Sequence, residues 1–175
     1  MNMTFQSIVL ALIVALVGSQ GLLLSPILPD IAGSFGVSIP TAAYAMAAYS
    51  GAIAVSAFFL ARFIDVVGPA WMARGALVVI ALGLIITGSA TSFTMLMIGQ
   101  VFNGLACGIL LPCTYALGAL IAPKGQEALY TGRVLSGWGI AMVLGVPFSA
   151  FIAENLHWRQ AFVILTIVAV LALIM

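Results

Sequence analysis

Apolar residues come in long runs that short polar segments separate. Six runs can be placed, at about residues 5–28, 41–62, 73–92, 94–122, 129–152 and 160–175. A helix needs roughly 20 apolar residues to cross a hydrocarbon core about 30 Å thick. The pattern therefore predicts an all-α membrane protein in which residues 1–175 form one bundle of six transmembrane helices.

Turn residues mark the connections between these runs. Pro40 precedes the second run, Gly68 and Pro69 separate the second from the third, and residues 123–127 separate the fourth from the fifth. The first run is too long for a secretory signal and no basic residue precedes it, so we expect it to be retained. The last run reaches only about 24 Å at 1.5 Å per residue. Its shortness favours a longer native chain or a natural half-length protein.

Basic residues are distributed unevenly over the connections. Arg62, Arg74, Lys124 and Arg133 flank the segments between runs two and three and between runs four and five, whereas Arg159 lies on the other side. Short loops rich in Lys and Arg stay in the cytoplasm. We therefore expect a multi-pass protein of the inner (plasma) membrane with a cytoplasmic N-terminus.

Composition narrows the class of protein. Hydrophobic residues make up 65% of the chain and charged residues 5%, against about 25% charged residues in soluble domains. A net charge of +1 provides no basic patch for phosphate groups, so we expect no nucleic-acid partner. Cys107 and Cys113 share one apolar run at a spacing that suits neither a metal site nor an intrahelical disulfide. The sequence contains no Walker A loop, zinc motif or nucleophile elbow, so we expect neither an enzyme nor a cofactor or metal.

Polar side chains inside apolar runs are costly in lipid and are therefore candidates for function. The candidates for a substrate path are Gln20, Tyr49, Gln100, Asn103, Tyr115, Ser136 and Trp138. Packing inside the bundle is the ordinary role of the aromatic members, and contact with a substrate is the alternative. Arg133 lies about one turn inside the fifth run. It either extends to the membrane interface or pairs with Asp65 or Glu127 in a gate.

The fifth run is unusually rich in helix-disfavouring residues. Glycine costs about 1 kcal/mol of helix propensity relative to alanine, and proline removes a backbone donor. The run nevertheless contains Gly132, Gly137, Gly139, Gly145 and Pro147. Two explanations stay open: close approach between helices, or a hinge that lets the fifth helix bend.

Residues 61–68 (Ala-Arg-Phe-Ile-Asp-Val-Val-Gly) resemble the signature between helices two and three of the major facilitator superfamily, with Asp65 and Gly68 at matching positions. In that family the aspartate locks the two halves of the transporter together in the outward-facing state. The resemblance therefore implies a gating role, for which the candidates are Asp65, Gly68, Arg62 and Arg133. This copy lacks the basic residues of the pattern, since Val66 follows the aspartate.

Residues 137–162 carry the second resemblance. Gly137, Gly139, Gly145 and Pro147 are similar to the fifth-helix motif of the family's antiporters, and Trp158, Arg159 and Phe162 are similar to the turn that follows it. Importers of the superfamily generally lack this motif, so the resemblance implies export by antiport with the first four residues as a hinge. Residues 28–32 and 49–51 resemble segments of the drug and sugar efflux branch. Gln100 stands where many efflux relatives carry an arginine that serves proton coupling.

The resemblance covers nearly the whole chain but only the first half of a twelve-helix transporter. It implies one half of a major facilitator fold, with six transmembrane helices as a 3+3 inverted repeat and helices one, two, four and five facing the cavity. The implied function is secondary active transport, the proton-coupled export of a small drug-like or sugar-like solute by alternating access. The expected partners are that solute, protons, the lipid bilayer and a second six-helix bundle, which is either a C-terminal half or a homodimer partner. The alternative is a degenerate half-transporter that serves as a non-transporting assembly or regulatory subunit.

Overall fold

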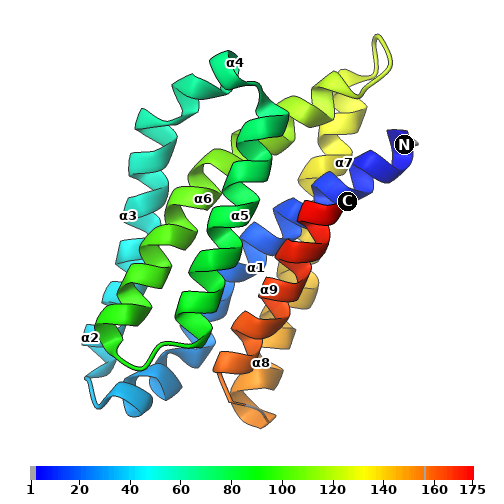
Figure 1. The fold of residues 1–175 in the computed structure, drawn as a ribbon. Coiled ribbons are helices and arrows are strands. Elements are labelled where there is room, and N and C mark those ends of the chain that lie inside the picture. The colour runs from blue at the N-terminus through cyan, green and yellow to red at the C-terminus, as the bar shows by residue number, and fades with distance from the viewer. Residues whose placement is uncertain (1–2, 156) are drawn as a thin grey trace.

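A computed structural model describes residues 3–155 and 157–175, which form helices joined by short turns (Figure 1). The long helices are α1 (Met3–Phe35), α3 (Tyr44–Phe59), α5 (Pro69–Gly88), α6 (Phe93–Leu120), α7 (Glu127–Ile140) and α9 (Arg159–Ile174). Shorter helices are α2 (Ile39–Ala42), α4 (Ile64–Val67) and α8 (Val146–Asn155). Neither described range contains a strand, so the predicted all-α class is confirmed.

Four segments are long and apolar enough to cross a membrane by length and composition. These are α1, Ile39–Phe59, α5 and α6, and α9 is apolar but shorter. The fifth apolar run follows α7, a π-helical turn (Ala141–Gly145) and α8 without an intervening loop. Six helical paths therefore correspond in order to the six runs, while the number of membrane crossings remains a prediction.

The first helix is longer than the run that predicted it. The sequence pattern ends this run near residue 28, but α1 continues to Phe35 with Pro26 and Pro29 inside it. Each proline removes one backbone donor from the helix. The last turns of α1 nevertheless bury Ile27 and Ile31 completely, and this packing offsets the lost hydrogen bonds.

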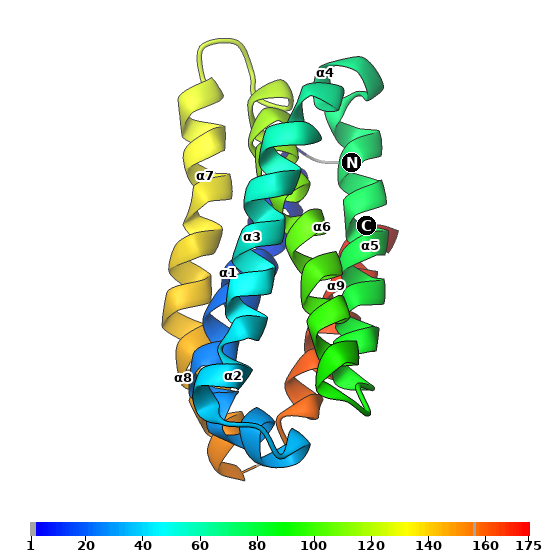
Figure 2. The ribbon, with the colours of Figure 1, turned by 90° about the vertical axis from the view of Figure 1, so that its left-hand side faces the viewer.

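The helices pair in a way that relates the first three paths to the last three. α3 packs on α6 as α7 packs on α1, and the remaining paths, α5 and α9, pack on each other. If α1, α3 and α5 are exchanged with α6, α7 and α9 in order, the pair of α3 and α6 becomes the pair of α7 and α1, and the pair of α5 and α9 stays the same. A 3+3 repeat requires this symmetry. In Figure 2, α7 lies at the left, α1 is seen between α7 and α3, and α5 lies at the right.

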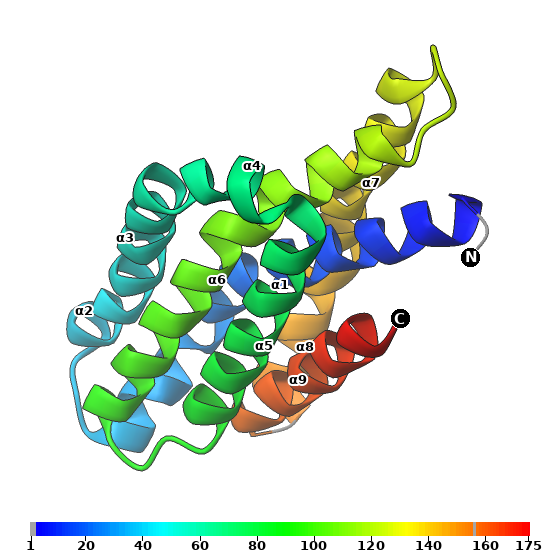
Figure 3. The same cartoon turned by 45° about the horizontal axis from the view of Figure 1, so that its top comes forward.

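The two ends of the bundle differ in charge. One end carries α4, the turn between α6 and α7 and the N-terminus, and the opposite end carries α2 and the turns before α6 and α9 (Figure 1). Figure 3 brings the first of these ends toward the viewer, with the start of α7 and the N-terminus on the same side. We call it the basic end, because Arg62, Arg74, Lys124 and Arg133 lie on or near its turns. The structure thus gathers on one end the residues that the positive-inside rule assigns to the cytoplasm.

Small residues bring α3 and α6 into close contact. A Cβ atom on Gly108 would lie 2.6 Å from the Ile53 carbonyl oxygen, and one on Gly104 would overlap the Tyr49 carbonyl oxygen. The Ser56 hydroxyl donates a 2.6 Å hydrogen bond to the Leu105 carbonyl oxygen across the same interface. Close backbone approach of this kind is how helices associate in lipid, where burial of apolar groups contributes little.

Candidate functional site

A chain of weak hydrogen bonds connects α1, α3 and α6 in the interior. The Tyr49 hydroxyl donates to the Cys107 sulfur at 3.4 Å, and the Cys107 thiol donates to Oε1 of Gln20 at 3.9 Å. All three side chains are buried. Cys107, which the sequence suggests only as a core packer, therefore connects two of the candidate substrate-path residues.

A second polar cluster lies between α5 and α6. Nε2 of Gln100 and Nδ2 of Asn103 each donate to Oγ1 of Thr87 at 3.4 Å, and this hydroxyl donates to the Gly83 carbonyl oxygen at 2.8 Å. Gln100 and Asn103 are fully buried. The structure therefore places these two candidates inside the half-bundle. The sequence pattern did not single out Thr87, because a threonine can satisfy its hydroxyl group on its own helix.

Three buried polar atoms in these clusters lack a hydrogen-bond partner within the described chain. They are Nε2 of Gln20, Oε1 of Gln100 and Oδ1 of Asn103. Buried amide atoms of this kind normally bind ordered water. The interior between α1, α5 and α6 thus contains amide groups whose hydrogen-bonding capacity the described chain does not satisfy.

Tyr115 and Trp138 form the most accessible polar contact between α6 and α7. The indole Nε1–H of Trp138 donates to the Tyr115 hydroxyl at 2.9 Å, and Trp138 is 36% exposed. The pair therefore presents two aromatic rings and a hydroxyl group on an open face of the half-bundle. Ser136 is separate from this pair, because its hydroxyl donates to the Arg133 carbonyl oxygen on its own helix.

The glycines of the fifth helical path divide into two kinds. A Cβ atom on Gly145 would lie 2.7 Å from the Ser19 hydroxyl oxygen, and one on Gly137 would overlap the Ala11 carbonyl oxygen of α1. A Cβ atom on Gly139 or Gly132 would meet no atom within 4 Å. Close helix packing therefore accounts for Gly137 and Gly145, and it does not account for Gly139 or Gly132.

A π-helical turn occupies the middle of this path. It spans Ala141–Gly145 and packs against α1, where a Cβ atom on Gly18 would lie only 2.7 Å from the Cβ atom of Ala141. Pro147 is the second residue after this turn and cannot donate a backbone hydrogen bond to a preceding carbonyl group. Wide turns of this kind interrupt the regular ladder and are frequent at functional sites. The sequence signalled a break here through the glycines and Pro147, without indicating its form.

The candidate gating residues lie at the basic end. Asp65 is exposed in the first turn of α4, and the Arg62 guanidinium lies 4.9 Å above the ring of Phe63. Gly68 has a φ of 92°, which side chains disfavour, and it turns the chain into Pro69 at the start of α5. The motif thus has a backbone role at Gly68, while the exposed Asp65 carboxylate can meet a partner outside the half-bundle.

Arg133 lies apart from the α4 region in this arrangement. Its guanidinium lies 4.8 Å above the ring of Tyr130. The Glu127 carboxylate instead accepts a 3.1 Å hydrogen bond from the Gly125 N–H. Backbone hydrogen bonds from Glu127 itself and from Gly125 hold the pKa of this exposed carboxyl below its usual range. Within the described half-bundle Arg133 thus contacts Tyr130, and its part in a gate stays a prediction.

A clamp of aromatic and basic residues closes the opposite end. The Arg159 guanidinium donates a 2.8 Å hydrogen bond to the Ala90 carbonyl oxygen and lies 4.5 Å above the ring of Trp158. The Trp158 indole N–H donates to the Ser34 hydroxyl at 2.9 Å. The clamp therefore joins the end of α1, the turn before α6 and the start of α9, which gives the motif around Trp158 a structural role.

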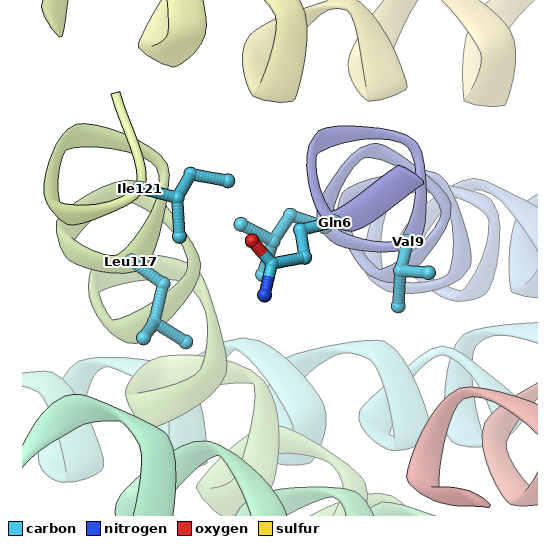
Figure 4. A pocket seen from close by; sticks show the side chains of 5 residues that line it. Gln6, Val9, Leu117 and Ile121 are labelled. Atoms are coloured by element: carbon cyan, nitrogen blue, oxygen red, sulfur yellow. The ribbon is translucent and has the colours of Figure 1, made fainter. Parts of the chain in front are cut away.

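A small pocket of about 150 Å³ opens between α1 and α6 at the basic end. Figure 4 shows the Gln6 amide on α1 facing the side chains of Leu117 on α6 and of Ile121, the residue after α6. Pockets that enclose drug-sized molecules usually measure about 300–1,000 Å³. This pocket is therefore a local separation of α1 from α6 rather than a substrate site.

Charged side chains lie toward the ends of the helical paths. The five basic and four acidic residues include none in the central turns of any of the six paths that the structure describes. No group of three His, Cys, Asp or Glu side chains that could hold a metal ion occurs among residues 3–155 and 157–175. The polar side chains in the central turns of the described helical paths are thus uncharged.

Relatives of the chain are named as transporters. The MFS-type transporter YwfA of Bacillus subtilis (strain 168) is 30% identical over 145 residues, which are 83% of this chain and 35% of that protein. The MFS-type transporter YbcL of the same organism is 25% identical over 179 residues, or 99% of this chain and 45% of that protein. The chloramphenicol resistance protein of Streptomyces lividans is 29% identical over 161 residues, or 87% of this chain and 39% of that protein.

The chain thus spans between about a third and just under half of the length of these relatives. A family model for the Major Facilitator Superfamily matches residues 10–175. This match covers almost the whole chain and agrees with the helix pairing and with the segments 61–68 and 137–162. The chain is therefore a multi-pass, all-α membrane protein with a transporter's helical half-fold, and it belongs to the major facilitator superfamily.

Proposed function

We propose that the chain forms the N-terminal half of a secondary transporter that exports a small solute by alternating access, with a second six-helix bundle completing the cavity. The observation that carries this proposal is the fifth helical path, where Gly137 and Gly145 pack tightly on α1 around a π-helical turn. The turn ends at Gly145 and joins α7 to α8. Bending at this irregular turn would move α8 against α7.

Proton coupling is part of the proposal, and the charge distribution limits where the proton binds. Neither an acid nor a histidine lies in the central turns of a described helical path, and Gln100 cannot titrate. A carboxylate that carries protons through the membrane must therefore belong to the second bundle. Among the acids of this half, Asp30 near the end of α1 lies nearest to the central turns of a helical path.

The substrate class follows from the accessible pair on α6 and α7. Tyr115 and Trp138 offer flat apolar rings joined by a hydrogen bond, and no charged group lies beside them in the sequence. Aromatic faces of this kind bind flat, weakly polar solutes by stacking. The chloramphenicol resistance protein of Streptomyces lividans, a relative of this chain, supports export of a drug-like compound. We therefore propose an uncharged, amphipathic solute that contains an aromatic ring.

Accumulation assays in cells that lack their own drug exporters test this proposal. Chloramphenicol and related neutral aromatic compounds serve as probes, with the full chain expressed from a plasmid. Cells with the parent chain should accumulate at least one probe to a lower level than cells without it. Trp138→Ala should reverse most of this effect, because stacking and the hydrogen bond to Tyr115 are both lost.

A matched control is Trp71→Ala at the basic end, where the indole is 68% exposed and stacks with Arg74. This variant should keep the parent's low accumulation. Equal accumulation with and without the chain for every probe would contradict export of this class. Equal loss in both tryptophan variants would show that the Trp138 effect is not specific to the site.

A further inference from the structure

A groove that neither Tyr115 nor Trp138 lines runs between the first turns of α1 and the second half of α7. Its volume is about 320 Å³, and we call it the α1–α7 groove. Ala11 lines the groove, and Gly137 lets α7 meet the α1 backbone at this residue. Leu12 and Ile140 on its walls are 41% and 38% exposed. The groove is thus an open, largely apolar channel on the surface of the half-bundle.

Polarity changes along this groove in one direction. α1 and α7 both start at the basic end, so residues early in each helix lie nearest that end (Figure 1 and Figure 3). Thr4, Ser7, Arg133 and Ser136 line this outer part. Leu12 and Ile140 line the inner part, about 12 Å deeper for Leu12 than for Thr4 at 1.5 Å per residue. The groove therefore matches a phospholipid, whose headgroup is polar and whose chains are apolar.

Charge at the outer part is positive. Among the residues that line the groove, Arg133 is the one charged side chain, and its guanidinium is held above the Tyr130 ring. The Glu127 carboxylate, six residues earlier on α7, accepts a hydrogen bond from Gly125 instead. An arginine placed in this way can donate two parallel hydrogen bonds to a phosphate group. Basic pockets between helices near the interface bind anionic headgroups by the same chemistry.

We propose that the α1–α7 groove binds one anionic phospholipid, with its phosphate on Arg133 and an acyl chain along Leu12 and Ile140. The lipid would lie against the interface between α1 and α7, at the start of the path that contains the π-helical turn. The proposal does not depend on which solute is transported.

Native mass spectrometry of the full chain in detergent tests this assignment. Phosphatidylglycerol and phosphatidylcholine with identical chains are added at equal concentration, and the bound fractions are compared. The parent should retain phosphatidylglycerol preferentially. Arg133→Gln should weaken phosphatidylglycerol binding about fivefold, the effect of one basic residue near a lipid surface. Ser136→Phe, which fills the groove, should weaken the binding of both lipids.

Arg62→Gln is the matched control, because Arg62 is also exposed at the basic end and also stacks on the ring of an aromatic residue. It should bind phosphatidylglycerol as the parent does. Unchanged binding in Arg133→Gln, or an equal loss in Arg62→Gln, would overturn the assignment. Displacement of the lipid by millimolar glycerol 3-phosphate alone would also overturn it, since the site would then recognise a free small anion.

Discussion

Asp65 is the residue at the basic end for which we predict a gating role. Its carboxylate is exposed in the described half-bundle, on the short helix between α3 and α5. Hydrogen bonds between a charged and a polar group contribute about 1.5–3 kcal/mol. If the second bundle donates such bonds in one transport state only, the populations of the two states shift about ten- to a hundredfold.

Asp65→Asn removes this charge at nearly constant size. We expect slower solute export and greater accessibility of cavity cysteines from the cytoplasmic side, with little change in expression. Transport and cysteine labelling of the full chain measure both effects. Glu127→Gln is the control, because that carboxylate is held by backbone groups of its own turn. If Asp65→Asn and Glu127→Gln both behave as the parent does, Asp65 has no gating role.

At the scale of single residues, the sequence identifies the candidate polar residues better than it identifies the side chains that they contact. Gln20, Gln100 and Asn103 stand out because amides are rare in apolar runs. Their contacts with Cys107 and Thr87 depend on how α1, α5 and α6 rotate against one another. Apolar periodicity does not define that rotation when a helix is apolar on most of its faces.

At the scale of a helix, glycine positions separate packing from flexibility. Gly145→Leu adds a side chain where a Cβ atom alone would lie 2.7 Å from the Ser19 hydroxyl oxygen. Overpacking of this kind costs typically about 1–3 kcal/mol. We expect Gly145→Leu to insert into the membrane and to lose export, as measured by solute flux.

Gly139→Leu provides the comparison within the same path. A Cβ atom at this position meets nothing within 4 Å, so the half-bundle itself should tolerate the larger side chain. We expect this variant to reach the membrane at the parent's level and to keep more export than Gly145→Leu. Normal export in Gly145→Leu would show that the close contact with α1 is not needed for transport.

The clamp at the opposite end has its own test. Arg159→Gln removes the charge-assisted hydrogen bond to the Ala90 carbonyl oxygen and the stacking on Trp158. A loss of about 1.5–3 kcal/mol in a chain of this size lowers the melting temperature by several degrees. Thermal unfolding in detergent measures the shift, and Arg62→Gln should leave the melting temperature unchanged. A parent-like melting temperature in Arg159→Gln would contradict the structural role of the clamp.

Helix order is easier to predict than helix ends and irregular turns. Run length predicts six helical paths because a bilayer sets a minimum length for apolar helices. The first apolar run ends near residue 28, whereas the buried packing of Ile31 accompanies a helix that continues to Phe35. The form of the π-helical turn does not follow from composition, since glycine and proline signal a break without specifying its geometry.

For the molecule as a whole, every proposal about gating depends on which end of the bundle faces the cytoplasm. Four of the five basic residues lie at the end with α4 and the turn between α6 and α7. The positive-inside rule therefore predicts that this end faces the cytoplasm. Cysteines introduced at Pro69 and Gly125 should react only with a reagent on the cytoplasmic side, and one at Asn155 only with a reagent outside. The opposite labelling pattern would reverse the orientation.

Flux into proteoliposomes tests the central claim of solute export driven by protons. The full chain is reconstituted with a radiolabelled neutral aromatic solute outside, and the vesicle interior is made acidic relative to the outside. An antiporter in the appropriate orientation should concentrate the solute inside while the pH gradient lasts, and a protonophore should abolish this accumulation. Uptake equal to that of protein-free vesicles, with and without the gradient across a panel of such solutes, would contradict the account.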